Sequence, residues 1–203
     1  MSHVTSRDGT KIAFERTGNG PALILVDGAL CSRAFGPSAK LASAFAATDA
    51  HVSVYRYDRR GRGESGDTEH YAIDREIEDL DALIAHAGGS AALLAFVPIM
   101  MRLMPWVWRK LVAVAHTLPY DAAVMTGFRV PQIRFASIRQ PVLVLNGSKT
   151  DPRLQAAARA VVAAVPEARH GVLAGQTHNV KPDALVTGSL AFLSSGRTLA
   201  ARS

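Results

Sequence analysis

Short apolar runs that close on polar or glycine residues place the tightest limit on how this chain folds. Ala22–Val26 is apolar throughout and closes on Asp27-Gly28. Val52–Tyr57 and Val142–Leu145 are rich in apolar, β-branched or aromatic residues, and each also ends in a polar, glycine-containing loop. Runs of this length and character are typical of strands buried on both faces, as in a parallel sheet.

Segments with helical periodicity separate these runs. In Ile73–His86, apolar residues recur at helical spacing and acidic residues occupy the other face. The remaining predicted elements are helices over Pro37–Ala47, Pro152–Val165 and Asp183–Leu193, and strands over Lys11–Thr17 and His170–Leu173. Strands that alternate with helices of about 10–15 residues predict an α/β fold with a mainly parallel sheet flanked by helices. We expect one domain over residues 1–203, with a frayed tail over 194–203.

The composition is that of a globular protein without disulfides. Hydrophobic residues make up 48% of the chain, and the lone cysteine, Cys31, has no partner for an internal bond. The net charge of +6 comes largely from dispersed arginines, so no nucleic-acid partner is expected. The sequence has no nucleotide fingerprint and no metal-ligand spacing, so we expect neither a cofactor nor a metal. Its N-terminus lacks a signal-like apolar stretch, and we expect a cytoplasmic protein.

One stretch, Ala91–His116, departs from the alternating pattern. It is apolar at first and then carries Trp106, Trp108 and flanking cations. A proline and an arginine interrupt the apolar part, so no stable membrane insertion is expected. Two interpretations stay open. Short helices here could cover an apolar pocket, which would make residues 91–128 a helical cap segment, or the stretch could lie in a membrane interface.

Polar side chains follow the predicted strands at their carboxyl ends, which is the edge of an open α/β sheet where ligands bind. Asp27 and Asp58 follow the first two buried runs. Asp151 follows the third, and His178 comes about 27 residues later, just past the last strand. An acid followed by a histidine, each just past a strand, is the chain order found in hydrolytic triads built on α/β sheets.

Three ordered motifs carry a family resemblance. They are Asp8-Gly9 with the later Gly20-Pro21, the loop Asp58-x-Arg60-Gly61-x-Gly63-x-Ser65, and the terminal Gly175-x-x-His178. In these motifs the chain resembles α/β-hydrolases of the esterase, epoxide-hydrolase and perhydrolase kind. The resemblance implies that His178 is a general base and that Asp151 orients it. From the residues alone, Asp151 could instead cap a helix and His178 could be a surface residue.

The resemblance also implies an oxyanion site and a substrate pocket. Backbone N–H groups around Gly28 and Ala29 would form part of the oxyanion hole, and the pocket would include Asp27, Cys31 and Trp106. The family usually has histidine at the position of Asp27. An ionised Asp27 would repel the negative charge that develops at an oxyanion site.

The nucleophile is the component that departs furthest from the family. Gly-x-Ser-x-Gly, the strained strand-to-helix turn that carries the catalytic serine, occurs nowhere in the 203 residues. Ser90, in Gly88-Gly89-Ser90-Ala91-Ala92, is a weak echo of that motif, and Cys31 is a second candidate. The passage that normally holds the serine turn, its helix and the next strand is missing, so the fold is expected to be truncated.

Two functions follow. The first is a hydrolase of small ester-type substrates that uses the His178–Asp151 pair, and its catalytic competence depends on a nucleophile outside the family pattern. The alternative is a non-catalytic hydrolase-like scaffold that binds a small apolar ligand or forms a homodimer through Ala91–Trp108. Both take a small molecule as substrate or ligand, without a cofactor.

Overall fold

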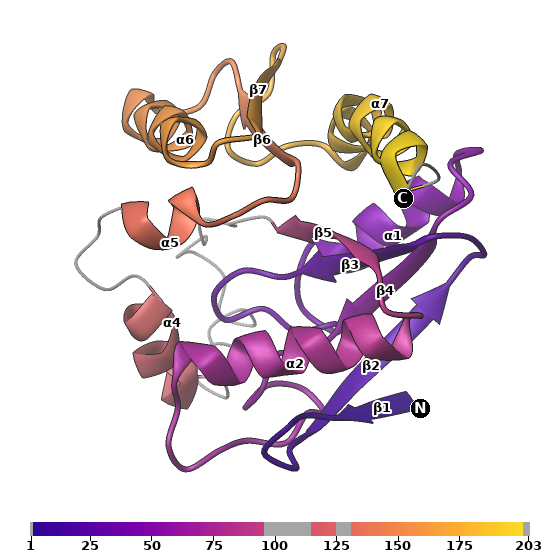
Figure 1. Ribbon diagram of the computed structural model, residues 1–203, viewed down its shortest axis with the longest axis vertical. Coiled ribbons are helices and arrows are strands. Elements are labelled where there is room, and N and C mark those ends of the chain that lie inside the picture. The colour runs from indigo at the N-terminus through magenta and orange to yellow at the C-terminus, as the bar shows by residue number, and fades with distance from the viewer. Residues whose placement is uncertain (1, 96–114, 125–130, 201–203) are drawn as a thin grey trace. The chain divides into compact units, whose positions relative to one another are not determined.

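The computed structural model describes residues 2–95, 115–124 and 131–200 (Figure 1). Contacts between residues divide the chain into two units, residues 1–126 and 127–203, which are described separately. The single domain expected from length stays a prediction. Within the described residues, no helix is long and apolar enough to cross a bilayer.

A five-stranded mixed sheet organises the first unit, with strand order β1-β2-β4-β3-β5. β3 pairs in parallel with both β4 and β5, whereas β2 pairs antiparallel with β1 and β4. The predicted parallel core therefore carries an antiparallel hairpin at one edge. The strands are β1 (Ser2–Thr5), β2 (Lys11–Thr17), β3 (Ala22–Val26), β4 (Ser53–Tyr57) and β5 (Ala91–Ala95).

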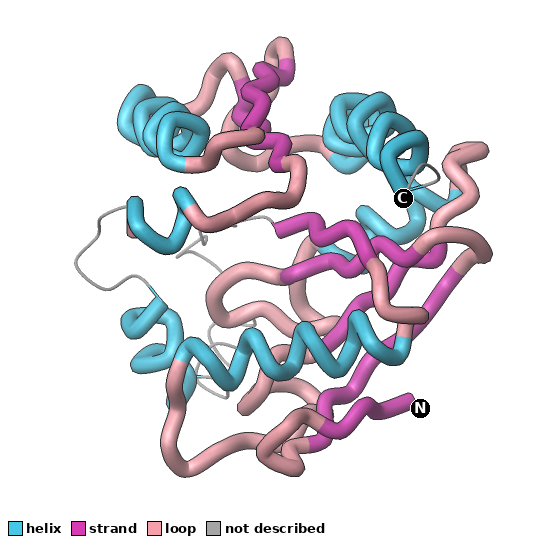
Figure 2. Tube along the Cα trace, viewed as in Figure 1, coloured by secondary structure: helices cyan, strands magenta, loops and turns pink. Residues whose placement is uncertain are grey.

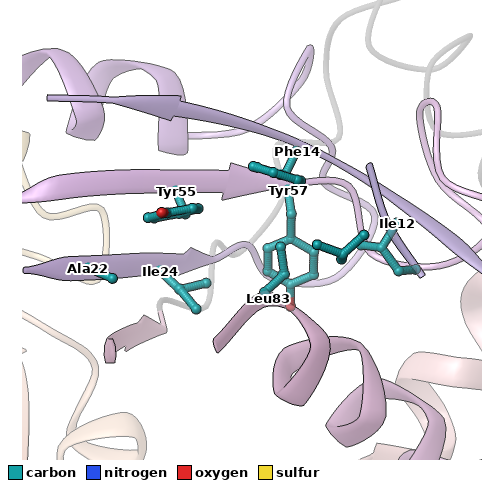
Figure 3. Packing of buried hydrophobic residues seen from close by; sticks show 8 residues of the cluster. Ile12, Phe14, Ala22, Ile24, Tyr55, Tyr57 and Leu83 are labelled. Atoms are coloured by element: carbon teal, nitrogen blue, oxygen red, sulfur yellow. The ribbon is translucent and has the colours of Figure 1, made fainter. Parts of the chain in front are cut away.

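Helices α1 (Ser38–Ala46) and α2 (Ile73–His86) flank this sheet (Figure 2). The core lies between the sheet and α2, where Leu83 is fully buried against strand residues (Figure 3). Phe14 and Tyr55 stack there with ring centroids 5.9 Å apart. The residues of this core cluster are Val4, Ile12, Phe14, Ala22, Ile24, Tyr55, Tyr57 and Leu83. The unit also includes a 3₁₀ turn, Ala115–Thr117, and the short helix α4 (Leu118–Val124).

The second unit is built on two parallel strands, β6 (Val142–Gly147) and β7 (Ala168–Leu173). Helix α7 (Pro182–Ala200) packs on them closely, because a Cβ built on Gly188 would lie 2.6 Å from a Leu173 methyl group. Gly188 therefore lets helix and strand approach. The connecting helices are α5 (Gln132–Ala136) and α6 (Pro152–Ala164).

The predicted α/β fold is confirmed, and the main differences concern element ends. The N-terminal strand β1 pairs antiparallel with β2 around Asp8-Gly9; the residues alone did not predict it, but the family resemblance implied an N-terminal hairpin at this place. Helix α7 continues to Ala200, past the predicted end at Leu193. Of the predicted cap segment 91–128, residues 91–95 form β5 and residues 115–124 are helical, while 96–114 and 125–128 lie outside the described residues.

Candidate functional site

Two loops meet at the carboxyl ends of β3 and β4. Because these strands are parallel neighbours, the segments that follow them emerge at the same edge of the sheet. The first begins at Asp27 and turns back through Gly28–Cys31. The second is the predicted motif loop from Asp58 to Ser65. An edge of this kind is where α/β sheets bind ligands.

The turn after β3 holds its backbone in an unusual conformation. Leu30 has φ 60°, in the left-handed region that a leucine side chain rarely adopts. The Cys31 N–H donates to the Gly28 carbonyl and closes the turn at 3.3 Å. Within the described part of the chain, the N–H groups of Gly28, Ala29 and Leu30 donate to no acceptor. Successive amides without acceptors in a turn are an arrangement that can bind an anion, which is the role that the family resemblance predicts for Gly28 and Ala29.

Asp27 lies directly before this turn and is 3% exposed. Neither of its carboxylate oxygens accepts a well-formed hydrogen bond among the described residues. Burial raises the pKa of this carboxyl to about 6, and the Ser38 hydroxyl and N–H, which lie beside the carboxyl as weakly placed donors, together with the charge of Arg56, offset part of the effect. A buried acid without partners favours its neutral form. This burial is not visible in the sequence, because an Asp-Gly pair after a strand usually marks a solvated turn.

Cys31 is buried beside Asp27. A Cβ built on Gly36 would lie 2.9 Å from an Asp27 oxygen and 3.2 Å from the Cys31 Cβ, so both side chains pack against that glycine. Burial, and then the Asp27 charge, raise the pKa of the Cys31 thiol to about 11. A protonated thiol is a poor nucleophile. This environment resembles that of a structural cysteine more than that of an activated one.

The motif loop Asp58–Ser65 is held by charge-assisted hydrogen bonds. Asp58 is 2% exposed and accepts from the backbone N–H of Arg33 at 2.7 Å and from its Nε at 3.1 Å. Gly63 has φ 55°, and a Cβ there would lie 2.2 Å from an Asp58 oxygen, so a side chain does not fit. Ser65 accepts from the Ala13 N–H and donates to the Asp58 carbonyl, and so holds the loop against β2.

Three arginines of this loop, Arg59, Arg60 and Arg62, bind partners in other elements. Arg59 pairs with Glu76 of α2 at 2.7 Å, and Arg60 pairs with Asp79 of α2 at 2.6 Å. Arg62, which is 1% exposed, donates from Nη1 to the Gly28 carbonyl at 3.3 Å. Arg62 therefore links the motif loop to the turn after β3.

Helix α4 is attached to the same loop. One oxygen of Asp121 accepts from Arg59 at 3.1 Å and from Arg62 at 2.8 Å. The Tyr120 ring stacks on Tyr71 with centroids 4.0 Å apart and planes 4° from parallel, and its hydroxyl donates to Asp67. The described part of the predicted cap segment is thus fixed by ionic and aromatic contacts.

Ser90 lies elsewhere. It is exposed and precedes β5, whose first residue, Ala91, is in register with Ala22 at the start of β3. Asp27 follows the other end of β3. The structure therefore places Ser90 and the turn Gly28–Cys31 at opposite ends of paired strands and does not bring them together.

The second unit brings the loops of Asp151 and His178 together. The Lys149 N–H donates to the Gln176 carbonyl at 2.8 Å, and the Gly175 N–H donates to the Ser148 hydroxyl oxygen at 2.8 Å. Gly147 is required here, because a Cβ would lie 2.2 Å from the Gln176 carbonyl oxygen.

Within these adjacent loops, both predicted catalytic side chains are exposed. Asp151 is the N-cap of α6 and accepts from the Arg153 N–H at 2.8 Å. Between the described side chains of Asp151 and His178, the structure has no hydrogen bond or ion pair. Trp106 lies outside the described residues. Among the residues that the structure describes, no group of three His, Cys, Asp or Glu side chains could hold a metal ion.

Comparison with known proteins identifies the family. Neither a protein-family model nor a functionally curated protein matches the chain. A solved α/β-hydrolase from Sphaerobacter thermophilus is 35% identical, with a TM-score of 0.82, and the match covers 94% of this chain and 99% of that one.

Two solved esterases share the fold at lower identity. An esterase from Exiguobacterium antarcticum is 14% identical with a TM-score of 0.71, over 97% of this chain and 99% of that one. An esterase from Rhodococcus is 19% identical with a TM-score of 0.67, over 96% and 98%. With 35% identity to a hydrolase along nearly the whole of both chains, this protein belongs to the α/β-hydrolase family.

Proposed function

We propose that the protein hydrolyses small ester-type substrates, with His178 as general base and Asp151 as the acid that orients it. The observation that carries the proposal is the junction of loops 147–151 and 173–178 through Lys149–Gln176 and Ser148–Gly175. It holds an acid and a histidine on adjacent loops past two parallel strands. A rotation of the exposed Asp151 and His178 side chains would be needed for them to meet, as apo catalytic pairs often require.

The first unit, taken by itself, has the turn Gly28–Leu30, to which the family resemblance assigns an oxyanion role. Its unpaired amides would stabilise the oxyanion that forms when an ester carbonyl is attacked. The nucleophile is the open component, since Gly-x-Ser-x-Gly is absent from the sequence. The proposed partner is a small molecule. Four arginines lie close together in the sequence, Arg56, Arg59, Arg60 and Arg62. Carboxylates of the protein itself pair with all four, and this pairing does not favour a nucleic-acid surface.

The test is intact-mass spectrometry after treatment with a fluorophosphonate probe, followed by peptide mapping of any adduct. The proposal expects one adduct per chain, at a residue whose labelling is lost in His178→Ala. A variant of another exposed histidine, His51→Ala, is the matched control and should label normally. Folded protein that takes up no probe, or labels equally in His178→Ala, would contradict the proposed mechanism.

The alternative is a non-catalytic scaffold that dimerises through the edge of β5. Among the described residues β5 pairs with β3 alone, and Leu93 on it is 49% exposed. The strand Ala91–Ala95 carries no charge, proline or bulge to discourage edge pairing. Sedimentation velocity tests this alternative: a dimer that Leu93→Lys converts to monomer supports it, and a monomeric wild-type chain excludes it.

A further inference from the structure

The search for a further role leads to Asp27, a buried titratable group that the proposed hydrolysis does not use. Both oxygens are inaccessible to solvent and accept no well-formed hydrogen bond within the described structure, and the Ser38 hydroxyl and N–H are the weakly placed donors beside them. Gly36 packs against one oxygen, so the carboxyl is enclosed by its own loop.

Unpaired donors lie next to this unpaired acceptor in the sequence. The three residues that follow Asp27 have N–H groups without acceptors in the described structure, and the strained Leu30 holds them in that arrangement. Ala29 is exposed, so the turn is open to solvent on one side. The amides can serve an external anion, or they can serve the Asp27 carboxylate if the turn rearranges.

We propose that Asp27 is a proton-controlled switch for an anion site formed by the N–H groups of Gly28, Ala29 and Leu30. The neutral carboxyl leaves these amides free to bind an anion. The ionised carboxylate recruits them, because a buried charge without hydrogen bonds is costly. It also repels an anion at the turn through its own charge. The inference rests on the oxyanion role assigned to this turn in the proposed function.

Three groups from other parts of the fold act on the Asp27 carboxyl. Helix α1 contributes the neutral Ser38, β4 contributes Arg56, and the following loop contributes Asp58. Arg56 and Asp58 have partners of their own, since Arg56 pairs with Glu15 and Asp58 pairs with Arg33.

Around the neighbouring Cys31 the charged groups are Arg59, Arg62 and Asp121. The Cys31 pKa is raised to about 11, so the thiol does not lose its proton in the range where Asp27 does. The Asp27 pKa of about 6 puts the switch between mildly acidic and neutral conditions.

The experiment follows the carboxyl and the amides in the same sample. The full chain, labelled with ¹³C and ¹⁵N, is titrated from pH 4.5 to 8 while the Asp27 carboxyl carbon and the amides of Gly28, Ala29 and Leu30 are recorded. The expected result is one shared midpoint near 6 for the carboxyl and the amides. In Asp27→Asn the amide transitions should disappear, and in Asp49→Asn, a variant of an exposed aspartate, they should be unchanged. Amides that do not move with the carboxyl overturn the proposal, and this holds from the wild type alone if Asp27→Asn fails to fold.

A second arm measures anion binding with methanesulfonate, which keeps one negative charge throughout this pH range. If only the neutral form binds, a pKa of about 6 makes the apparent affinity about 100-fold weaker at pH 8 than at pH 5. Asp27→Asn should remove most of that difference. Equal binding at both pH values, or no binding at either, overturns the proposal. If the protein takes up no fluorophosphonate but the NMR and anion titrations behave as expected, the proposed hydrolysis is contradicted and the proposed switch is supported.

Discussion

Arg60, in the loop after β4, and Asp79, on α2, form an ion pair in which neither side chain is exposed to solvent. The contact is two-pronged, with Nη2–Oδ1 at 2.6 Å and Nε–Oδ2 at 2.9 Å. Arg60 also reaches Asp8 at 2.9 Å and holds the pKa of that carboxyl well below its usual range. One guanidinium therefore joins the motif loop, α2 and the turn after β1.

Asp79→Ala should destabilise the fold by about 3–5 kcal/mol, because it removes the two-pronged, fully buried partner of Arg60 and leaves the more exposed Asp8 as the remaining carboxylate. Urea unfolding at pH 7 measures the change. Glu78→Ala is the matched control, since Glu78 pairs with Arg75 nearer the surface of the same helix. Its loss should cost about 0.5 kcal/mol or less. Equal costs for the two variants would show that the buried pair has no special structural role.

Asp27→Asn should stabilise the protein at pH 8 and leave it nearly unchanged at pH 4. The carboxyl has a pKa of about 6 when folded, against an ordinary value of 3.8. The free energy of unfolding therefore falls as the pH rises from about 4 to 6, and this loss persists above pH 6. At 1.36 kcal/mol for each pKa unit, the loss is up to about 3 kcal/mol. The difference in unfolding free energy between wild type and variant, measured at several pH values, isolates Asp27; a difference that does not vary with pH would refute the shift.

Cys31 should react slowly with thiol reagents in the folded protein. A pKa of about 11, against 9.0 for an ordinary thiol, lowers the thiolate fraction at pH 7.5 by about 100-fold, and burial slows access further. The rate with a disulfide reagent, compared between native and urea-unfolded chain, measures this. A native rate equal to or above the unfolded rate would instead identify Cys31 as an activated nucleophile.

Asp121→Asn should loosen helix α4. The substitution removes the charge that pairs with both Arg59 and Arg62, and it leaves Arg62 buried with weaker compensation. Hydrogen exchange of the peptide covering residues 118–124 should become faster, with a stability cost of about 1–3 kcal/mol. Tyr120→Phe is a milder control, because it loses the hydroxyl contact to Asp67 and retains the ring contact with Tyr71.

The sequence predicted the elements with strong local signals. Ala22–Val26 is observed with the predicted bounds, because a continuous apolar run is favourable only in a strand buried on both faces. β1 has no strong local signal, because its short stretch, with histidine and serine beside a single valine, gains its order from pairing with β2; only the family resemblance implied a hairpin there. Pairing with β2 across the turn, rather than the local strand propensity of its residues, determines that β1 forms.

The candidate site was predictable in part. The chain order indicated that Asp151 and His178 follow neighbouring strands, and the loops do join through Lys149 and Gln176. The burial of Asp27 and the partners of Arg59 and Arg62 were not predictable, because they depend on which side chains a turn encloses after folding. The clustering of arginines at 56–62 was a visible signal, but their acidic partners are distant in the sequence.

Asp151 has an observed structural role and a proposed catalytic role, and two substitutions distinguish them. Its carboxylate caps α6 by accepting from the Arg153 N–H at 2.8 Å. Asp151→Asn keeps a side-chain oxygen for that bond and should leave stability almost unchanged, whereas Asp151→Ala should cost about 1 kcal/mol. If Asp151 also orients His178, both variants should lose ester hydrolysis alike, because neither has a carboxylate to stabilise the imidazolium. Urea unfolding and nitrophenyl-ester turnover are measured on the same preparations. If Asp151→Asn keeps full ester turnover and only the less stable Asp151→Ala loses turnover, Asp151 acts as a helix cap alone. The proposed pairing of Asp151 with His178 would then be wrong.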